Sequence, residues 1–157
     1  MLPLLIRGLL SQRTPVRLLL LIGSQDLTAD EYEYLTTLKK QLTAMLGGDF
    51  RLAVAEHAPA AIAKCDVLVR PTLADGDAVS IREALALGLG VVASDVVQRP
   101  PETWTYRVND GDDLVRKVLL AIRRARCEAG RAEVGRDDAI AELEAVYCRL
   151  GAAKQGG

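Results

Sequence analysis

The stretch from Asp66 to Asp95 reads DVLVRPTLADGDAVSIREALALGLGVVASD. With the preceding Cys65, its first residues form the short, mostly apolar run Cys65 to Val69, whose two valines are typical of a buried strand. A loop that contains an Asp-Gly pair follows, and Ser80 to Leu87 then has apolar residues at helical spacing before a glycine. A second apolar run, Val91 to Ser94, predicts another strand. The stretch therefore predicts a strand, a helix and a second strand joined by short loops, which is the repeating unit of a parallel sheet.

The same alternation extends in both directions along the chain. Upstream, the pattern predicts a helix in the first ten residues, a strand at Val16 to Gly23, a helix that starts with the capping box Thr28 to Glu31 and ends at Gly47, a strand at Phe50 to Val54 and a short helix opened by Pro59. Downstream it predicts an edge strand at Trp104 to Val108, a helix from Asp112 to Arg126 and a last amphipathic helix with Ile140, Leu143, Val146, Tyr147 and Leu150. This order predicts an α/β fold: a Rossmann-like three-layer αβα domain with a mostly parallel, doubly wound sheet. We expect one domain over residues 1–151 and a disordered tail at 152–157.

The composition excludes several classes of function. The chain has 157 residues, of which half are apolar, and its formal net charge is -1. Nucleic-acid binding needs clustered cationic surface, so we expect no such partner. The three cysteines are far apart and lack metal-ligand spacing, so we expect reduced thiols, no metal site and a cytoplasmic protein. No stretch is apolar over the length that a membrane span needs, and Arg7 interrupts the apolar N-terminus in a way that a signal peptide does not.

Residues between the strand that ends near Arg70 and the following helix are the strongest candidates for ligand binding. In a doubly wound sheet, ligands bind beyond the carboxyl ends of the strands. The amides of Gly76, Asp77, Ala78, Val79 and Ser80 lie at a helix start, where unpaired N–H groups and the helix dipole favour a phosphate. The carboxylates of Asp75 and Glu83 bracket this turn and could accept hydrogen bonds from sugar hydroxyls.

These residues resemble the donor-binding domain of group 1, or family 4, glycosyltransferases. The signature of that family is a Glu, then Gly, an aromatic residue and Gly, and a second Glu eight positions after the first; Asp75 and Glu83 match the two acidic positions. The flanks, Asp66 to Thr72 and Glu83 to Asp95, are also similar to the family. The resemblance extends from Val16 to about Val108. In this sequence Asp77 and Ala78 replace the aromatic residue and the second Gly.

The resemblance implies the fold and roles of a retaining, metal-independent GT-B enzyme, with a nucleotide diphosphate sugar as donor substrate and no cofactor. It assigns to Asp75 a contact with the transferred sugar and to Glu83 the ribose hydroxyls, and these two are the candidate catalytic residues. The amides of residues 76–80 would approach the sugar and the diphosphate. Gly23 and the loop with Glu56 and His57 would complete the donor site near the nucleobase.

The family completes its site with an N-terminal acceptor-binding domain, in cis or in trans, and with diphosphate-binding Arg and Lys residues from an earlier strand. We therefore expect donor binding without full catalysis by this chain alone, and transfer to a glycan or lipid-linked acceptor in polysaccharide biosynthesis. A partner could hold it at the inner membrane face. The alternative is a non-catalytic interaction or scaffold domain with a degenerate donor site, acting with a separate partner or as a homo-oligomer.

Each candidate residue also has a purely structural interpretation. Asp75 could stabilise a turn, Glu83 could complement the dipole of its helix, and Ser80 could be the N-cap. Arg70 could supply positive charge for a phosphate, but it ends a strand, so we expect it to form a salt bridge. The segment Arg99 to Glu102 contains two prolines and is either the far rim of the sugar site or a rigid turn.

Overall fold

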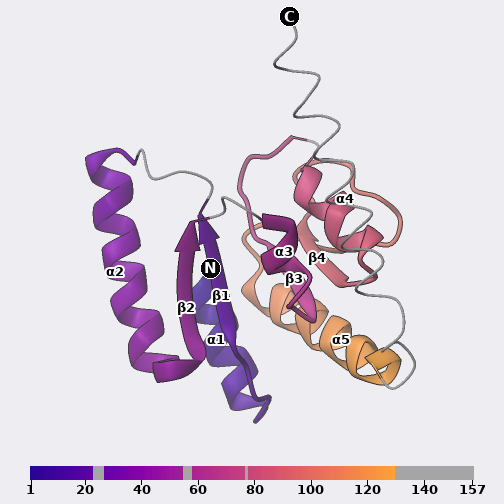
Figure 1. Ribbon diagram of the computed structural model, residues 1–157, viewed down its shortest axis with the longest axis horizontal. Helices are drawn as coiled ribbons and strands as arrows, with labels where there is room; N and C mark the ends of the chain where they lie inside the picture. Colours follow the sequence, from indigo (N-terminus) through magenta and orange to yellow (C-terminus); the bar gives the residue numbers. More distant parts are fainter. Residues whose placement is uncertain (23–26, 55–57, 77, 130–157) are drawn as a thin grey trace, which may run out of the picture.

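The computed structural model describes residues 1–22, 27–54, 58–76 and 78–129 (Figure 1). The elements alternate between helices and strands from the N-terminus. In chain order they are α1 (Leu2–Ser11), β1 (Leu18–Ile22), α2 (Ala29–Leu46), the 3-10 turn η1 (Gly47–Asp49), β2 (Phe50–Val54), α3 (Ala58–Ile62), β3 (Val67–Arg70), α4 (Val79–Ala86), β4 (Gly90–Ser94), β5 (Trp104–Tyr106) and α5 (Gly111–Ala129). The predicted last helix and the tail at 152–157 lie outside the described residues.

All strand pairs in the described residues are parallel, as predicted, and the strands form two groups. β1 pairs with β2 from Leu18 opposite Phe50 to Ile22 opposite Val54. β4 lies between β3 and β5, and Arg70 of β3 is opposite Ala93 of β4. Figure 1 shows β1 and β2 beside α2, and β3 and β4 beside α3, α4 and α5. The α/β, Rossmann-like fold class is confirmed, and no hydrogen-bonded pairing joins β1 to β3 in the described residues.

Strand β4 shows why the domain has three layers. Side chains alternate between the two faces of a strand. Val91 and Ala93 accordingly pack in one apolar cluster with Ile81 and Ala84 of α4, whereas Val92 packs in another with residues of α1 and α5. All three β4 residues are fully buried. Helices therefore cover both faces of β4, which is the αβα arrangement predicted from the sequence.

Helix α1 contributes to two apolar clusters. Leu5 and Leu9, one helical turn apart, pack with Leu114 and Val118 of α5. Ile6 lies in the cluster of α2 and β2. A buried side chain of this size stabilises the fold by about 1.5–3 kcal/mol. The apolar residues of α1 are thus mostly internal, and Leu4 and Leu10 are its exposed ones.

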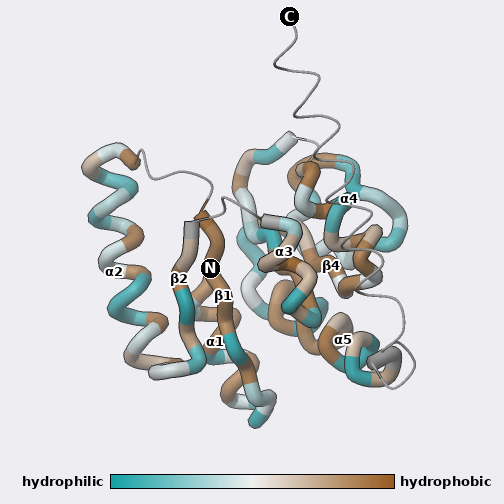
Figure 2. The backbone as a smooth tube through the Cα atoms, in the orientation of Figure 1, coloured by the Kyte–Doolittle hydropathy of each residue, from teal (hydrophilic) through white to brown (hydrophobic). Residues whose placement is uncertain are grey.

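Helix α2 is delimited by local chemistry that the sequence shows. The Thr28 hydroxyl accepts a hydrogen bond from the Glu31 amide at 3.3 Å, and the Glu31 carboxylate accepts one from the Thr28 amide at 2.9 Å. The predicted capping box is therefore confirmed. At the other end, Gly47 has a positive φ of 54°, a conformation that favours glycine. Figure 2 shows hydrophilic and hydrophobic residues alternating along α2, whose apolar side faces β2.

Candidate functional site

The loop between β3 and α4 is held against the end of β4. The Ser94 hydroxyl, fully buried at the last position of β4, donates a hydrogen bond to the carbonyl oxygen of Thr72 at 2.7 Å. Because β3 and β4 are parallel neighbours, their carboxyl ends lie together, and the loops that follow them meet. This edge is where a doubly wound fold binds its ligands.

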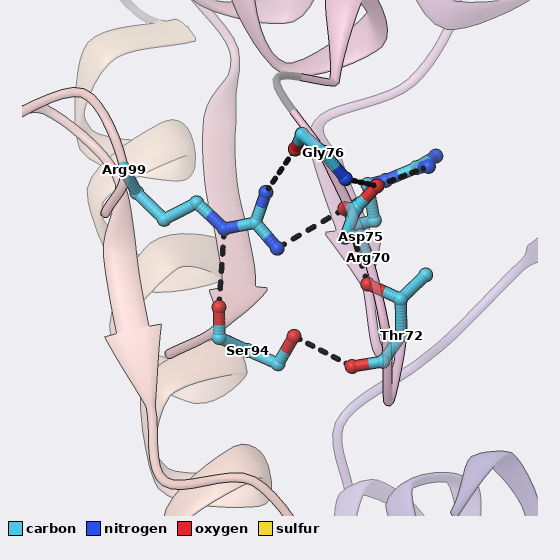
Figure 3. Close-up of polar contacts among 6 residues, drawn as sticks. All are labelled: Arg70, Thr72, Asp75, Gly76, Ser94 and Arg99. Carbon is cyan, nitrogen blue, oxygen red and sulfur yellow. Dashed lines mark hydrogen bonds and ion pairs between the residues drawn. The ribbon is translucent and has the colours of Figure 1, made fainter. Parts of the chain in front are cut away.

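Asp75 lies at the centre of the polar contacts in this loop, between the guanidinium groups of Arg70 and Arg99 (Figure 3). Arg70 donates from Nε to Oδ2 at 2.7 Å and from a terminal nitrogen to Oδ1 at 3.0 Å. Arg99 donates to Oδ2 at 3.1 Å. The Thr72 hydroxyl and the Gly76 amide donate at 3.1 and 3.0 Å.

These contacts occupy the whole carboxylate of Asp75. A carboxylate has about four lone-pair positions, and Asp75 accepts five hydrogen bonds. Its side chain is 6% exposed. The hydrogen bonds from Arg70, above all, hold the pKa of Asp75 far below its usual range despite burial, so the group is ionised at any physiological pH. A sugar hydroxyl could bind this carboxylate only by displacing one of the present donors.

Arg99 comes from the segment after β4 and is the most deeply buried cation of the site. Its side chain is 2% exposed. Besides Asp75, it donates to the carbonyl oxygens of Ser94 at 3.1 Å and Gly76 at 3.4 Å. Arg99 thus joins the end of β4 to the loop after β3. The segment beginning at Arg99 was interpreted from sequence as a rim or a turn, and its side chain belongs to the site itself.

Glu83 is the second predicted acidic residue, and its surroundings differ from those of Asp75. It lies within α4, is 6% exposed, and has neighbours of the apolar cluster, Ile81 and Ala84, on either side in sequence. Among the described residues, no donor hydrogen-bonds to its carboxylate and no cation pairs with it. Burial raises the pKa of Glu83 above its ordinary value. Burial disfavours the ionised form of this carboxylate, and hydrogen-bond donors from a ligand would offset part of that cost.

The start of α4 presents backbone amides without a side-chain cap. Ala78 occupies the N-cap position, and no side chain accepts a hydrogen bond from the first turn there. The interpretation of Ser80 as the N-cap is therefore wrong, because Val79 already begins the helix. Val79 is exposed, as is Leu73 in the preceding loop. The first turn combines polar amides with apolar side chains at the surface.

The structure places part of the predicted site. Asp75, Gly76, Ala78, Val79 and Ser80 follow one another in the loop and first turn of α4, with Glu83 further along that helix. The other predicted donor-binding residues lie outside the described residues: Gly23, Glu56, His57 and Asp77. The salt bridge predicted for Arg70 is confirmed. The role of Arg99 was missed, because no local pattern indicates a contact between residues 24 positions apart.

Other features of the described part of the chain do not add to this site. A hollow of about 500 Å³ is lined by Leu4 and residues 107–112, and another of about 360 Å³ includes Trp104 and Gly88. Neither is lined by Asp75 or Glu83. Within the described ranges, no three His, Cys, Asp or Glu side chains are grouped as a metal site would need, and no helix has the length and apolarity to cross a membrane.

Comparison with protein-family models identifies a family for most of the chain. The model of the family described as "Glycosyl transferases group 1" matches residues 4–124. No curated protein matches the chain. The matched range begins in α1 and includes the five strands of the described residues, the β3–α4 loop, Glu83 and most of α5. The resemblance drawn from the motif around Asp75 and Glu83 is thereby confirmed: the chain belongs to the group 1 glycosyltransferases.

Proposed function

We propose that this chain is the donor-binding unit of a retaining glycosyltransferase and binds a nucleotide diphosphate sugar without a metal ion. The observation that carries the proposal is Glu83, a buried carboxylate that has no partner among the described residues. Its free acceptor positions suit vicinal hydroxyls such as those of a ribose. The hydroxyls of a ligand would supply the donors that the described residues do not give this carboxylate.

The diphosphate is assigned to the start of α4. The amides of Ala78, Val79 and Ser80, with that of Asp77 before them, would face an anion at the N-terminus of the helix, whereas the Gly76 amide already donates to Asp75. In transfer with retention, these fixed donors would stabilise the negative charge that develops on the departing diphosphate. Gly23, Glu56 and His57 complete the proposed site near the nucleobase.

Two roles are open to Asp75. The family resemblance gives it a contact with the transferred sugar, which requires a donor to leave the carboxylate first. The contacts in this structure give it a second role, as the group that orients Arg70 and Arg99. An acceptor-binding domain, in cis or in trans, would close the site from the opposite side and bring a glycan or lipid-linked acceptor. A cytoplasmic location, at the inner membrane face when a partner holds it there, is part of the same proposal.

Ligand-observed NMR with UDP-, GDP- and ADP-sugars tests the proposal directly. One class of donor should bind the wild-type chain. Glu83→Gln should weaken that binding by tenfold or more, because the amide has no charge and replaces one acceptor oxygen by an NH2 donor. Glu33→Gln is the matched control, since Glu33 is exposed on α2. Equal donor affinity of the wild type and Glu83→Gln would remove Glu83 from the site.

A second candidate function is a non-catalytic interaction domain. The fully occupied carboxylate of Asp75 and the exposed apolar side chains of Leu73 and Val79 favour it, because they describe a surface suited to a protein contact rather than to a sugar. Such a domain would bind none of the donors. Light scattering after size exclusion would then show a dimer, or a complex with a separate acceptor domain.

A further inference from the structure

Arg70 and Arg99 both donate to the carboxylate of Asp75, but they differ in exposure and in how many of their N–H groups are hydrogen-bonded. All three nitrogens of the Arg99 guanidinium donate to protein oxygens, and its side chain is 2% exposed. Arg70 ends β3, and its side chain is 35% exposed. Two of its five N–H groups donate to Asp75. Its remaining N–H groups have no acceptor among the described residues.

The geometry points to Arg70 as a ligand of the donor's diphosphate, with Asp75 as the residue that positions it. The inference rests on the proposed function and deepens it, because it names a cationic group for the anion. A guanidinium that is clamped on one edge by a carboxylate presents its other edge in a fixed orientation, and this planar fork matches phosphate oxygens. Less side-chain entropy is then lost on binding than for a free arginine.

The position of Arg70 supports this role. It is the last residue of β3 and leads into the loop whose other end is the uncapped first turn of α4. An anion at that turn would lie at the same edge of the sheet as the Arg70 side chain. In Figure 3 the Arg70 guanidinium lies on the side of Asp75 away from Arg99, so the buried pair does not enclose it.

The inference assigns a different role to each of the three residues. Arg99 closes the buried side of the Asp75 carboxylate and is structural. Arg70 is held by the same carboxylate and contacts the diphosphate. Asp75 contacts neither the sugar nor the phosphate, and acts through Arg70. This differs from the contact with the transferred sugar that the resemblance implies for the acidic residue at this position.

The test measures three kinds of ligand by isothermal titration calorimetry on the full chain. They are the nucleoside diphosphates UDP, GDP and ADP, the corresponding nucleosides, and the UDP-, GDP- and ADP-sugars. Arg70→Gln should weaken nucleoside diphosphate binding by tenfold or more and leave nucleoside binding unchanged, because only the phosphate contact is lost. Arg70→Lys retains the charge without the planar fork, so its affinity for a nucleoside diphosphate should lie between those of the wild type and Arg70→Gln. The increase of Kd with salt should be smaller in Arg70→Gln than in the wild type.

Asp75→Asn separates a positioning role from a sugar contact. If Asp75 acts through Arg70, the substitution changes the affinity for a nucleoside diphosphate and for its sugar conjugate by the same factor. A change confined to the sugar conjugate would overturn the inference. Arg116→Gln is the matched control, because Arg116 also pairs with an aspartate, Asp113, but lies exposed on α5. Thermal unfolding of each variant establishes that it is folded, and Arg70→Lys and Asp75→Asn are informative even if Arg70→Gln does not fold.

The outcomes distinguish this inference from the function on which it rests. Absence of diphosphate binding by the wild type would overturn both. Binding that is lost in Glu83→Gln but unchanged in Arg70→Gln would leave the donor-binding function in place and overturn the role of Arg70. Binding that is weakened in Arg70→Gln, with Asp75→Asn acting equally on the diphosphate and on its sugar conjugate, supports both.

Discussion

Replacing Arg99 by Met should destabilise the protein substantially, although the residue lies in a loop. The substitution preserves much of the side-chain volume but removes three hydrogen bonds, to Asp75 and to the carbonyl oxygens of Ser94 and Gly76. Removing one partner of a buried ion pair typically costs about 3–5 kcal/mol. Asp75 retains its other donors, including Arg70, so we expect about 2–4 kcal/mol, which is below the full cost of an orphaned charge.

Urea denaturation followed by circular dichroism at pH 7 measures this change in the free energy of unfolding. For a domain of this size, each kcal/mol corresponds to about 2–4 °C in Tm, so Arg99→Met should lower Tm by about 4 °C or more. Arg116→Met is the control. Its pair with Asp113 is exposed, with 68% of the Arg116 side chain accessible, and exposed pairs contribute about 0–1 kcal/mol. Equal destabilisation by the two substitutions would refute the buried contacts of Arg99.

The pH dependence of the Asp75 contribution has a definite sign. The pKa of Asp75 is lowered in the folded state, so its stabilisation is fully present above its ordinary pKa of 3.8 and is lost as pH falls through the folded value. A double-mutant cycle between Asp75→Asn and Arg99→Met should therefore give a coupling energy of about 1–3 kcal/mol that is constant from pH 7 to about pH 5. A coupling that disappears near neutral pH would contradict the assignment.

Three further substitutions test other parts of the structure by thermal and urea unfolding. Glu83→Gln should raise Tm at pH 7, because burial raises the pKa of Glu83 and the free-energy cost of ionising it grows as pH rises above 4.5. The gain in Tm should vanish below about pH 4. A lower Tm of the variant at pH 7 would indicate that the ionised Glu83 has a stabilising partner. Gly8→Ala should lower the free energy of unfolding by about 1–3 kcal/mol, because a Cβ there would lie 2.5 Å from a Val115 methyl carbon. Gly48→Ala is the control, since a Cβ at Gly48 would have no atom within 4 Å. Equal effects of the two substitutions would contradict the close approach of α1 and α5. Thr103→Val should leave the free energy of unfolding within about 0.5 kcal/mol or raise it, since the buried Thr103 hydroxyl has no partner within the described ranges; a larger loss would reveal one.

Local signals in the sequence were sufficient for the elements and the fold class. The capping box at Thr28, the continuous apolar run of β1 and the glycine after α4 each act within a few residues of the boundary that they define. β2 has the predicted bounds, and the predicted start of β3 at Cys65 differs by two residues from Val67. The sequence also identified Asp75 and Glu83 as a pair, because their spacing depends only on one loop and one helix.

Other features depended on the register between strands. Parallel pairing of β3 with β4 places Arg70 opposite Ala93, and the segment after β4 then delivers Arg99 to Asp75. Nothing within a few residues of Arg99 encodes this contact, because the two residues are brought together by the sheet. The two acidic residues therefore look equivalent in sequence and differ in the folded chain. The carboxylate of Asp75 is saturated by donors from the end of β3, from the loop that follows it and from the segment after β4. The carboxylate of Glu83, in α4, has no partner among the described residues.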